Sequence, residues 1–424
     1  MSRYARYLTG DPSLMRQLNL AVVMHYLREH APVYRAQLAE MTGLNKTTVS
    51  SLIRELIAQK FVHEAGPRVN GSTGRPAVLL ELNPAAGCAI AAEVGVDFLM
   101  VEVANFAAEV VWHKTETMSA NQDQQAILDR LLILLRSAIA QGLAVTDRVL
   151  GIAAGVPGLV DQHSGRLIFA PNLGWVDVPL GDLLRQAFPG PIFLDNEANL
   201  AALGEVQFGA AQGYRDVIYV SASRGLGGGI VRDGQLCRGS MGFAGEFGHM
   251  TIDPAGALCR CGNRGCWESR ASELSLFNLI QQALKAGRPS LLATDAQDDK
   301  TPCTVSQVVD AAAAGDVVAL ESLRLVGREL GIGIASLVNA FNPELVVLGG
   351  TLSLASEFLL PEIESELVRR ALRWSREAVQ LAVAQHRLAA CVMGGIATVL
   401  QSVLTESGTV SVSRDVSGIH YERR

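Results

Sequence analysis

The hydrophobic pattern of the first 82 residues predicts three helices followed by two strands. Apolar side chains recur at the spacing of an α-helix in three consecutive stretches, and Gly43 supplies the turn between the second and the third. Two apolar runs joined by a Gly- and Pro-rich tip then read as antiparallel strands. This order is typical of a winged helix-turn-helix domain, an α+β fold that places one helix in the major groove of DNA. The predicted helices span residues 14–30, 35–41 and 45–59, and the predicted strands span 61–64 and 77–82.

The third predicted helix and the tip of the hairpin carry groups suited to DNA. Asn45 is suited to cap the helix, and basic or hydroxyl side chains on its exposed side match guanine edges, phosphate or the thymine methyl group. Arginines at the tip can reach phosphate or the minor groove. The predicted DNA contacts are Asn45, Lys46, Thr47, Thr48, Ser50, Arg54, Arg68 and Arg75. The alternative for this unit is a small helical module that binds protein.

Beyond residue 83 the pattern changes to strands that alternate with helices, which indicates an α/β body with two lobes. The glycine-rich segment 225–229 is expected to be a turn at the end of a strand, where such sheets place ligands. Strands are predicted within 89–112 and at 149–156, 192–195, 217–221 and 345–348, and the last helix at 394–404. The predicted divisions are residues 1–82 for DNA binding, 83–405 for the body and 406–424 for a polar tail; the lobes cover about 83–200 plus the C-terminal helix, and 200–380.

Charge is distributed unevenly between these parts. Residues 1–82 hold 10 Lys and Arg against 6 Asp and Glu, whereas the remainder holds 26 against 36. A basic head on an acidic body suggests a polyanionic partner for the head alone. Seven cysteines, three of them clustered, and an N-terminus without an apolar signal core fit a reducing cytoplasm.

One His and three Cys fall within 18 residues: His249, Cys259, Cys261 and Cys266. Thiolate and imidazole are the ligands of tetrahedral zinc, and three Cys with one His complete its coordination sphere. A closed sphere leaves no position for water, so we expect structural rather than catalytic zinc. The alternative is a chance run of buried cysteines, which the three cysteines within eight residues make the weaker reading.

The motifs around this cluster resemble those of the ROK family, named for repressors, uncharacterised frames and sugar kinases. The resemblance is carried by Gly225–Ile230, Gly239, Gly245–His249 and the Cys-x-Cys-x4-Cys run that ends at Glu268, and it covers residues 83 to about 404. Asp195–Asn199 and Met250–Asp253 look most like the xylose-repressor subgroup. The implied body is a duplicated actin-like sugar kinase fold of the ribonuclease H-like class, usually assembled as dimers.

The resemblance also implies a sugar site. Carried over residue by residue, the sugar-binding set is Asn196, Glu197, Glu246, His249 and Glu268. Carboxylates and amides suit the adjacent hydroxyls of a pyranose. His249 would offer one ring nitrogen to zinc and the other to the sugar, so the ion would orient a ligand-binding residue. The alternative for Glu246 and Glu268 is that they neutralise nearby arginines. Asn172 and Gly158 are further candidates.

The kinase machinery of the family looks degraded here. The ATP-binding hairpin corresponds to residues 93–97, where a glycine has become Val96 and a threonine has become Asp97, whose charge opposes phosphate. Glu197 stands where the kinases have a catalytic Asp. The expected function is therefore a sugar-responsive repressor, without enzymatic activity, that D-xylose or D-glucose releases from operator DNA. The alternatives are a sugar kinase with an appended DNA-binding domain, and a metal-responsive regulator.

Overall fold

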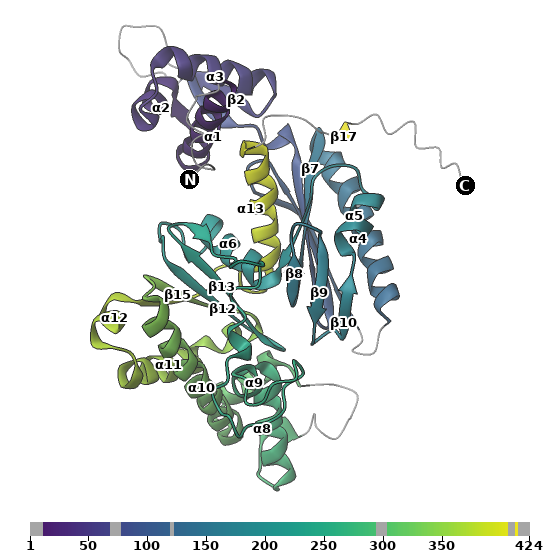
Figure 1. Ribbon diagram of the computed structural model, residues 1–424, viewed down its shortest axis with the longest axis vertical. Helices are drawn as coiled ribbons and strands as arrows, with labels where there is room; N and C mark the ends of the chain where they lie inside the picture. The colour runs from purple at the N-terminus through teal and green to yellow at the C-terminus, as the bar shows by residue number, and fades with distance from the viewer. Residues whose placement is uncertain (1–11, 68–77, 119–122, 294–302, 406–411, 414–424) are drawn as a thin grey trace, which may run out of the picture.

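The computed structural model describes residues 12–67, 78–118, 123–293, 303–405 and 412–413 (Figure 1). An N-terminal unit sits at one end of an elongated molecule, and two lobes follow it. Within the described residues, no helix combines the length and the apolar character needed to cross a membrane.

The N-terminal unit contains three helices and a small sheet in the strand order β1-β3-β2. The predicted helices and strands of this unit are confirmed. The predicted contacts Arg68 and Arg75 lie outside the described residues. The elements are α1 (Pro12–His30), β1 (Val33–Tyr34), α2 (Arg35–Thr42), α3 (Lys46–Ala58), β2 (Val62–Pro67) and β3 (Val78–Leu82).

Lobe 1 is built on a mixed sheet in the order β11-β7-β4-β5-β6, with β17 (Val412–Ser413) also paired to β7. Alternate residues of β4 face opposite sides: Ile90 packs in the cluster of α4 and α5, whereas Ala91 faces α13. The elements are β4 (Cys88–Val94), β5 (Phe98–Asn105), β6 (Val110–Thr117), β7 (Arg148–Val156), β11 (Ile192–Asn196), α4 (Gln124–Val145), α5 (Leu180–Ala187) and α13 (Ala390–Thr405). A small sheet of β8 (Leu159–Asp161), β9 (Arg166–Ala170) and β10 (Trp175–Val178) lies beside them.

Lobe 2 contains a five-stranded sheet in the order β14-β13-β12-β15-β16. Its strands are β12 (Val217–Ala222), β13 (Leu226–Arg232), β14 (Gln235–Leu236), β15 (Leu345–Gly349) and β16 (Gln380–Val383). Ile218 and Val220 face the main helical layer, while Val217 and Tyr219 face α6 (Glu197–Phe208). The helices of the lobe are α7 (Glu268–Ala271), α8 (Glu273–Lys285), α9 (Val305–Ala313), α10 (Val317–Phe341), α11 (Ser356–Arg370) and α12 (Arg373–Ala378).

The segment 225–229 was expected to be a turn, but it is a turn only at its start. The expectation is wrong for the rest of the segment. Gly227, Gly228 and Gly229 belong to β13, which pairs antiparallel with β12. A Cβ on Gly228 would lie 2.3 Å from the Phe247 ring, and one on Gly229 would lie 2.6 Å from the Cβ of Ala202. The glycines therefore serve close packing of α6 and the 245–249 segment against this strand.

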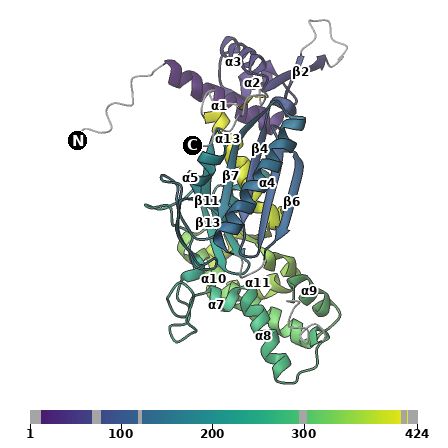
Figure 2. The same ribbon diagram turned by 90° about the vertical axis from the view of Figure 1, so that its right-hand side faces the viewer.

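Helices α6 and α13 pack closely and join the two lobes to the N-terminal unit. Gly204 allows the approach, because a Cβ there would lie 2.5 Å from the carbonyl oxygen of Ala390. From that point α13 runs along lobe 1 to α1, and its residues Val392 and Leu400 share one apolar cluster with Leu27 of α1 (Figures 1 and 2). One helix thus extends from the lobe junction to the N-terminal unit.

The N-terminal unit also contacts lobe 1 through Arg148. Its Nη2 donates to the carbonyl oxygen of Gln59 at 3.2 Å, and its guanidinium lies 4.5 Å from the centroid of the Phe61 ring. Phe61 in turn packs on Phe106, with ring centroids 4.9 Å apart. A cation over an aromatic face and a shared apolar cluster dock the unit on the body.

Candidate ligand pocket and metal centre

A cleft of about 320 Å³ lies between the two lobes, in the size range of sites for small organic ligands. Its walls come from strand ends and hairpin turns of both lobes and from the first residues of α13. The structure brings the five residues of the predicted sugar set together here. The lining includes Asn196, Glu197, Glu246, His249 and Glu268, and also Asn172 and Gly158.

Asn196 is positioned by its role as the N-cap of α6. Its Oδ1 accepts from the backbone N–H of Ala198 at 2.8 Å and of Asn199 at 3.2 Å, while its Nδ2 donates to the carbonyl oxygen of Gly158 at 3.0 Å. One N–H of the amide therefore stays available on the cleft side. Because β11 runs directly into this cap, Asn196 and Glu197 both face the cleft at a helix N-terminus.

Glu197 and Glu93 are acidic groups enclosed by protein. Burial raises the pKa of Glu197 well above its usual range, and the neighbouring carboxyls of Glu246 and Glu93 raise it further. Burial likewise raises the pKa of Glu93 to about 8, opposed by a hydrogen bond with Cys391. Within the described residues, the Oε2 atoms of Glu93 and Glu197 have no hydrogen-bond partner. A ligand rich in hydroxyl groups would supply the missing partners.

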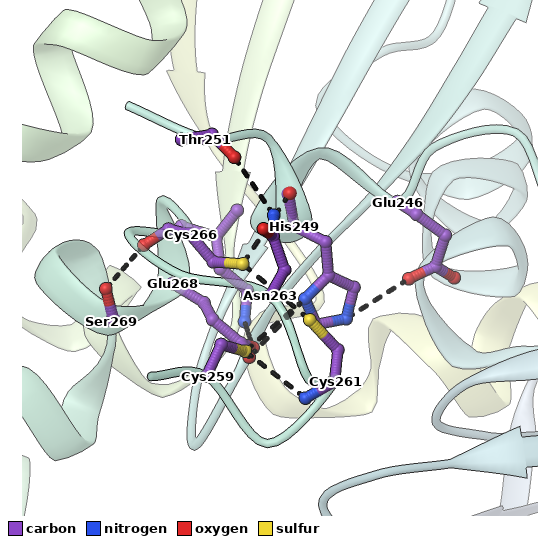
Figure 3. A network of polar contacts seen from close by, with 10 residues as sticks. Glu246, His249, Thr251, Cys259, Cys261, Asn263, Cys266, Glu268 and Ser269 are labelled. Carbon is purple, nitrogen blue, oxygen red and sulfur yellow. Dashed lines mark hydrogen bonds and ion pairs between the residues drawn. The ribbon is translucent and has the colours of Figure 1, made fainter. Parts of the chain in front are cut away.

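The His and Cys residues of the predicted metal centre converge (Figure 3). One ligand atom from each of His249, Cys259, Cys261 and Cys266 lies within 4.8 Å of the others. The Sγ atoms of Cys261 and Cys266 are 3.7 Å apart, and the Sγ of Cys259 is 3.8 Å from Nδ1 of His249. Sulfur atoms bound tetrahedrally to zinc at about 2.3 Å would lie about 3.8 Å apart. The four residues can therefore hold a metal ion, and their spacing fits zinc.

Tight backbone turns build this group from a short segment. The N–H of Cys259 donates to the carbonyl oxygen of Asn263 at 2.7 Å, and the N–H of Gly262 donates back to that of Cys259 at 3.0 Å. Gly262 has φ +94° and Gly265 has φ +64°, a region that glycine adopts without strain. An isolated β-bridge between Thr251 and Cys266 then ties the segment to the chain just after His249, which ends a short 3-10 helix, Phe247–His249.

His249 lies between the metal group and the cleft. Nδ1 faces Cys259, whereas Nε2 lies 3.9 Å from Oε2 of Glu246 on the cleft side (Figure 3). Oε1 of Glu268 lies 2.9 Å from the Sγ of Cys259 and 3.6 Å from Nδ1 of His249, and Oε2 accepts from the N–H of Leu226 at 3.4 Å. Burial raises the pKa of Glu246, with His249 acting in the opposite direction. The two ring nitrogens of His249 thus address different neighbours, as expected for a residue shared by ion and ligand.

Two ion pairs between the lobes were missed by sequence reasoning. Arg224, in the β12–β13 turn of lobe 2, lies 2.7 Å from Asp97 of lobe 1. Arg238 of lobe 2 lies 2.7 Å from Asp195, a buried residue of β11. From its position in the sequence, Asp97 is expected only to oppose phosphate. The partners are 127 and 43 residues apart, so no periodicity or motif spacing pointed to them.

The predicted DNA contacts of the third helix lie at its N-terminus, except Arg54, which lies past its middle. Asn45 caps α3, since its side chain accepts from the N–H of Thr48 at 2.7 Å. Lys46, Thr47 and Arg54 are exposed, and Thr48 and Ser50 are half-buried. The Nε of Arg54 donates to the carbonyl oxygen of Ser50 at 3.3 Å. The helix therefore presents its polar N-terminal residues outward while Val49, Leu52 and Ile53 are buried.

Residues 89–402 match the model of the ROK family. The chain belongs to the ROK family. The xylose repressor of Caldicellulosiruptor bescii is 35% identical to it over 93% of this chain and 98% of the relative. The family resemblance read from the glycine and cysteine motifs is thus confirmed.

The chain is similar in structure to solved ROK proteins of two kinds, a transcriptional regulator and a sugar kinase. A ROK transcriptional regulator described as a homologue of Escherichia coli MLC has a TM-score of 0.78 and 31% identity, and covers 92% of this chain and 97% of its own. A ROK glucokinase from Streptomyces griseus, solved with glucose and AMPPNP, has a TM-score of 0.66 and 31% identity, and covers 74% of this chain and 99% of its own. The body of this ROK protein therefore has the actin-like fold shared by the family's repressors and sugar kinases.

We predict that Glu93→Gln flattens the dependence of stability on pH. The unfolded chain loses this proton near pH 4.5, whereas the folded chain keeps it until about pH 8. Between these values the unfolded state binds fewer protons, so stability falls as pH rises. Thermal unfolding at about pH 5 and pH 8 should show a smaller fall in Tm for the variant than for the wild type. Glu357→Gln, at an exposed position of α11, should keep the wild-type fall. An unaltered fall in Glu93→Gln would contradict the assignment.

Proposed function

We propose that this ROK protein is a DNA-binding transcriptional repressor that responds to a sugar. The observation that carries the proposal is that an N-terminal unit precedes the ROK body in this chain. The glucokinase match covers 74% of this chain but 99% of its own, whereas the regulator match covers 92% of this chain. Since residues 83–424 are about four-fifths of the chain, the regulator match must extend into the N-terminal unit.

The N-terminal unit is proposed to be a winged helix-turn-helix domain covering residues 1–82. Helices α2 and α3 are joined by a turn at Gly43, which has φ +69°, and the β2–β3 hairpin supplies the wing. We place α3 in the major groove, since its exposed N-terminal residues are polar or basic. The proposed contacts are Asn45, Lys46, Thr47, Thr48, Ser50, Arg54 and, on the wing, Arg68 and Arg75.

The effector is proposed to be D-xylose or D-glucose, bound in the cleft by Asn196, Glu197, Glu246, His249 and Glu268. Four of these five residues carry titratable groups, and the amide of Asn196 retains one free N–H; together they can pair with adjacent hydroxyls. The relative from Caldicellulosiruptor bescii is named a xylose repressor, which favours the pentose.

Zinc is proposed to be a structural ion held by His249, Cys259, Cys261 and Cys266. Three sulfurs and one imidazole complete a tetrahedral sphere, so the ion supplies no open position for water. When bound, it would fix the orientation of the His249 ring while Nε2 stays directed toward the cleft. The proposed role is a clamp that positions part of the sugar site.

We propose that catalysis has been lost. Val96 and Asp97 occupy the hairpin that faces the cleft, and Asp97 pairs with Arg224. Glu197, at the position of the kinases' catalytic Asp, is one methylene longer, and a misplacement of about 1 Å can cost on the order of 100-fold in rate. The alternative, a sugar kinase, is supported by the structural similarity to the Streptomyces griseus glucokinase.

In the proposed switch, sugar stabilises one arrangement of the two lobes, and a homodimer carries two N-terminal units whose spacing fits operator half-sites. Helix α13 connects the two ends, because Ala390 and Cys391 line the cleft and Leu400 packs with α1. Movement at the cleft can thereby change the separation of the DNA-binding units.

We predict that D-xylose or D-glucose weakens operator binding by about tenfold or more, a typical size for coupled sites. Operator fragments are obtained by sequencing DNA retained by the purified protein, and affinity is then measured with and without each sugar. Unchanged affinity with both sugars would exclude these effectors, and unchanged affinity with a broad panel of pentoses and hexoses would exclude the switch. Sugar-dependent ATP consumption that is abolished in Glu197→Gln would instead establish the kinase.

We predict that Cys261→Ser lowers zinc content, thermal stability and sugar affinity together. Loss of one ligand opens the sphere, and Tm should fall by at least about 5 °C. Cys237→Ser is the matched control, because Cys237 is an exposed cysteine outside the metal group. Normal sugar affinity in a zinc-free protein would contradict the role of the ion as a clamp.

A further inference from the structure

The cleft has a second half, away from the metal centre, that the proposed sugar set does not use. Its walls are the β4–β5 turn of lobe 1, the β12–β13 turn of lobe 2 and the start of the segment that follows β15. Glycine-containing turns at strand ends, facing each other across a cleft, are where α/β folds commonly hold phosphoryl groups. Gly95 and Gly350 line this half, whereas Gly225 lies where it meets the sugar set, beside Asn172 and Glu268.

Arg224 lines this half of the cleft. Its Nη2 and Nε lie 2.7 Å and 3.0 Å from Oδ2 of Asp97, which belongs to the opposite lobe. Its Nε also lies 3.9 Å from Oε1 of Glu273, at the start of α8 in its own lobe. One guanidinium is thus held between two carboxylates, one from each lobe. The two carboxylates therefore compete with a phosphate oxygen for Nε and Nη2 of Arg224.

Both donors of Thr351 are also engaged by the protein. Its hydroxyl donates to Oε2 of Glu273 at 2.7 Å, and its backbone N–H donates to Oγ of Ser223 at 3.0 Å. Arg224, Asp97, Glu273 and Thr351 therefore form a continuous polar network across the lobes, which we call the clasp. Within the clasp, Nε and Nη2 of Arg224 and the two donors of Thr351 each have a protein acceptor.

The charge of the side chains that line the cleft also opposes a phosphoryl group. Its lining includes six carboxyl side chains and two arginines. Even with Glu93 and Glu197 protonated, carboxylates outnumber guanidinium groups. A phosphoryl group would have to displace a carboxylate from Arg224 and then lie beside it, and like charges placed side by side are strongly unfavourable. A neutral polyol meets neither obstacle.

We propose that Arg224 is a specificity-determining residue: held by Asp97 and Glu273 in the clasp, it closes the second half of the cleft to phosphoryl groups. The protein therefore selects unphosphorylated sugars and rejects both sugar phosphates and nucleotides. The choice of sugar rests on the proposed function, whereas the exclusion of nucleotides does not.

The test compares three probes on the full-length protein by calorimetry: D-glucose, D-glucose 6-phosphate and AMPPNP with Mg²⁺. The wild type should bind D-glucose at least about tenfold more tightly than its phosphate and should show no measurable binding of AMPPNP. Asp97→Asn removes a negative charge from Arg224, so the affinity for D-glucose 6-phosphate relative to D-glucose should rise about tenfold, and AMPPNP binding should become measurable. Adding Arg224→Gln to Asp97→Asn should abolish that gain, because the cation is then absent.

Asp177→Asn is the matched control, since Asp177 forms an exposed ion pair with Arg166 in lobe 1 and does not line the cleft. It should leave the ratio of the three affinities unchanged. Glu273→Gln approaches the clasp from the other lobe and should shift the ratio in the same direction as Asp97→Asn, which keeps the test decisive if one variant does not fold. Tight binding of a phosphoryl probe by the wild type, or an unaltered ratio in both clasp variants, would overturn the proposal. Failure of D-glucose to bind, with the expected AMPPNP pattern, would exclude this sugar as the effector and leave the clasp intact.

Discussion

Acidic side chains enclosed between the two lobes place the strongest physical demand on this structure, because a buried carboxyl group without a partner is costly. The structure meets the demand in several ways. Asp195 is paired with Arg238 and Asp97 with Arg224, each between the two lobes. Glu93 and Glu197 remain without partners at one oxygen, and their pKa values are raised in consequence. The unpaired groups lie where we place the sugar, whereas the paired groups lie around it.

The metal group contributes to the same arrangement. A segment of irregular backbone holds His249 and brings Glu246 and Glu268 to either side of its ring. With little regular secondary structure to support that segment, an ion bound by four side chains would supply the missing rigidity. The cleft and the N-terminal unit then share α13, whose first residues line the former and whose last turns pack beneath the latter. In the proposed switch, this continuity would let an event between the lobes affect DNA binding.

Much of this organisation could be predicted from the sequence, because local patterns carry it. The helical periods around Leu27 and Leu52, the cap at Asn45 and the tight spacing of Cys259, Cys261 and Cys266 each report on neighbours in the chain. The glycines at 227–229 were wrongly predicted to form a turn, because glycine is common both in turns and in strands that other segments approach closely. Only the contacts with Phe247 and Ala202 show that these glycines belong to a closely packed strand. The pairing of Arg224 with Asp97 could not be predicted, because it depends on how the two lobes meet.

The central claim is that sugar and operator DNA bind to the same protein at different sites and oppose each other. Thermodynamic linkage requires the opposition to be reciprocal. The most direct measurement is therefore a calorimetric titration of D-xylose into the protein alone and into the protein saturated with operator DNA. The account predicts a Kd for the sugar that is higher in the presence of operator, by the same factor by which the sugar weakens operator binding. An equal Kd in both titrations would contradict it.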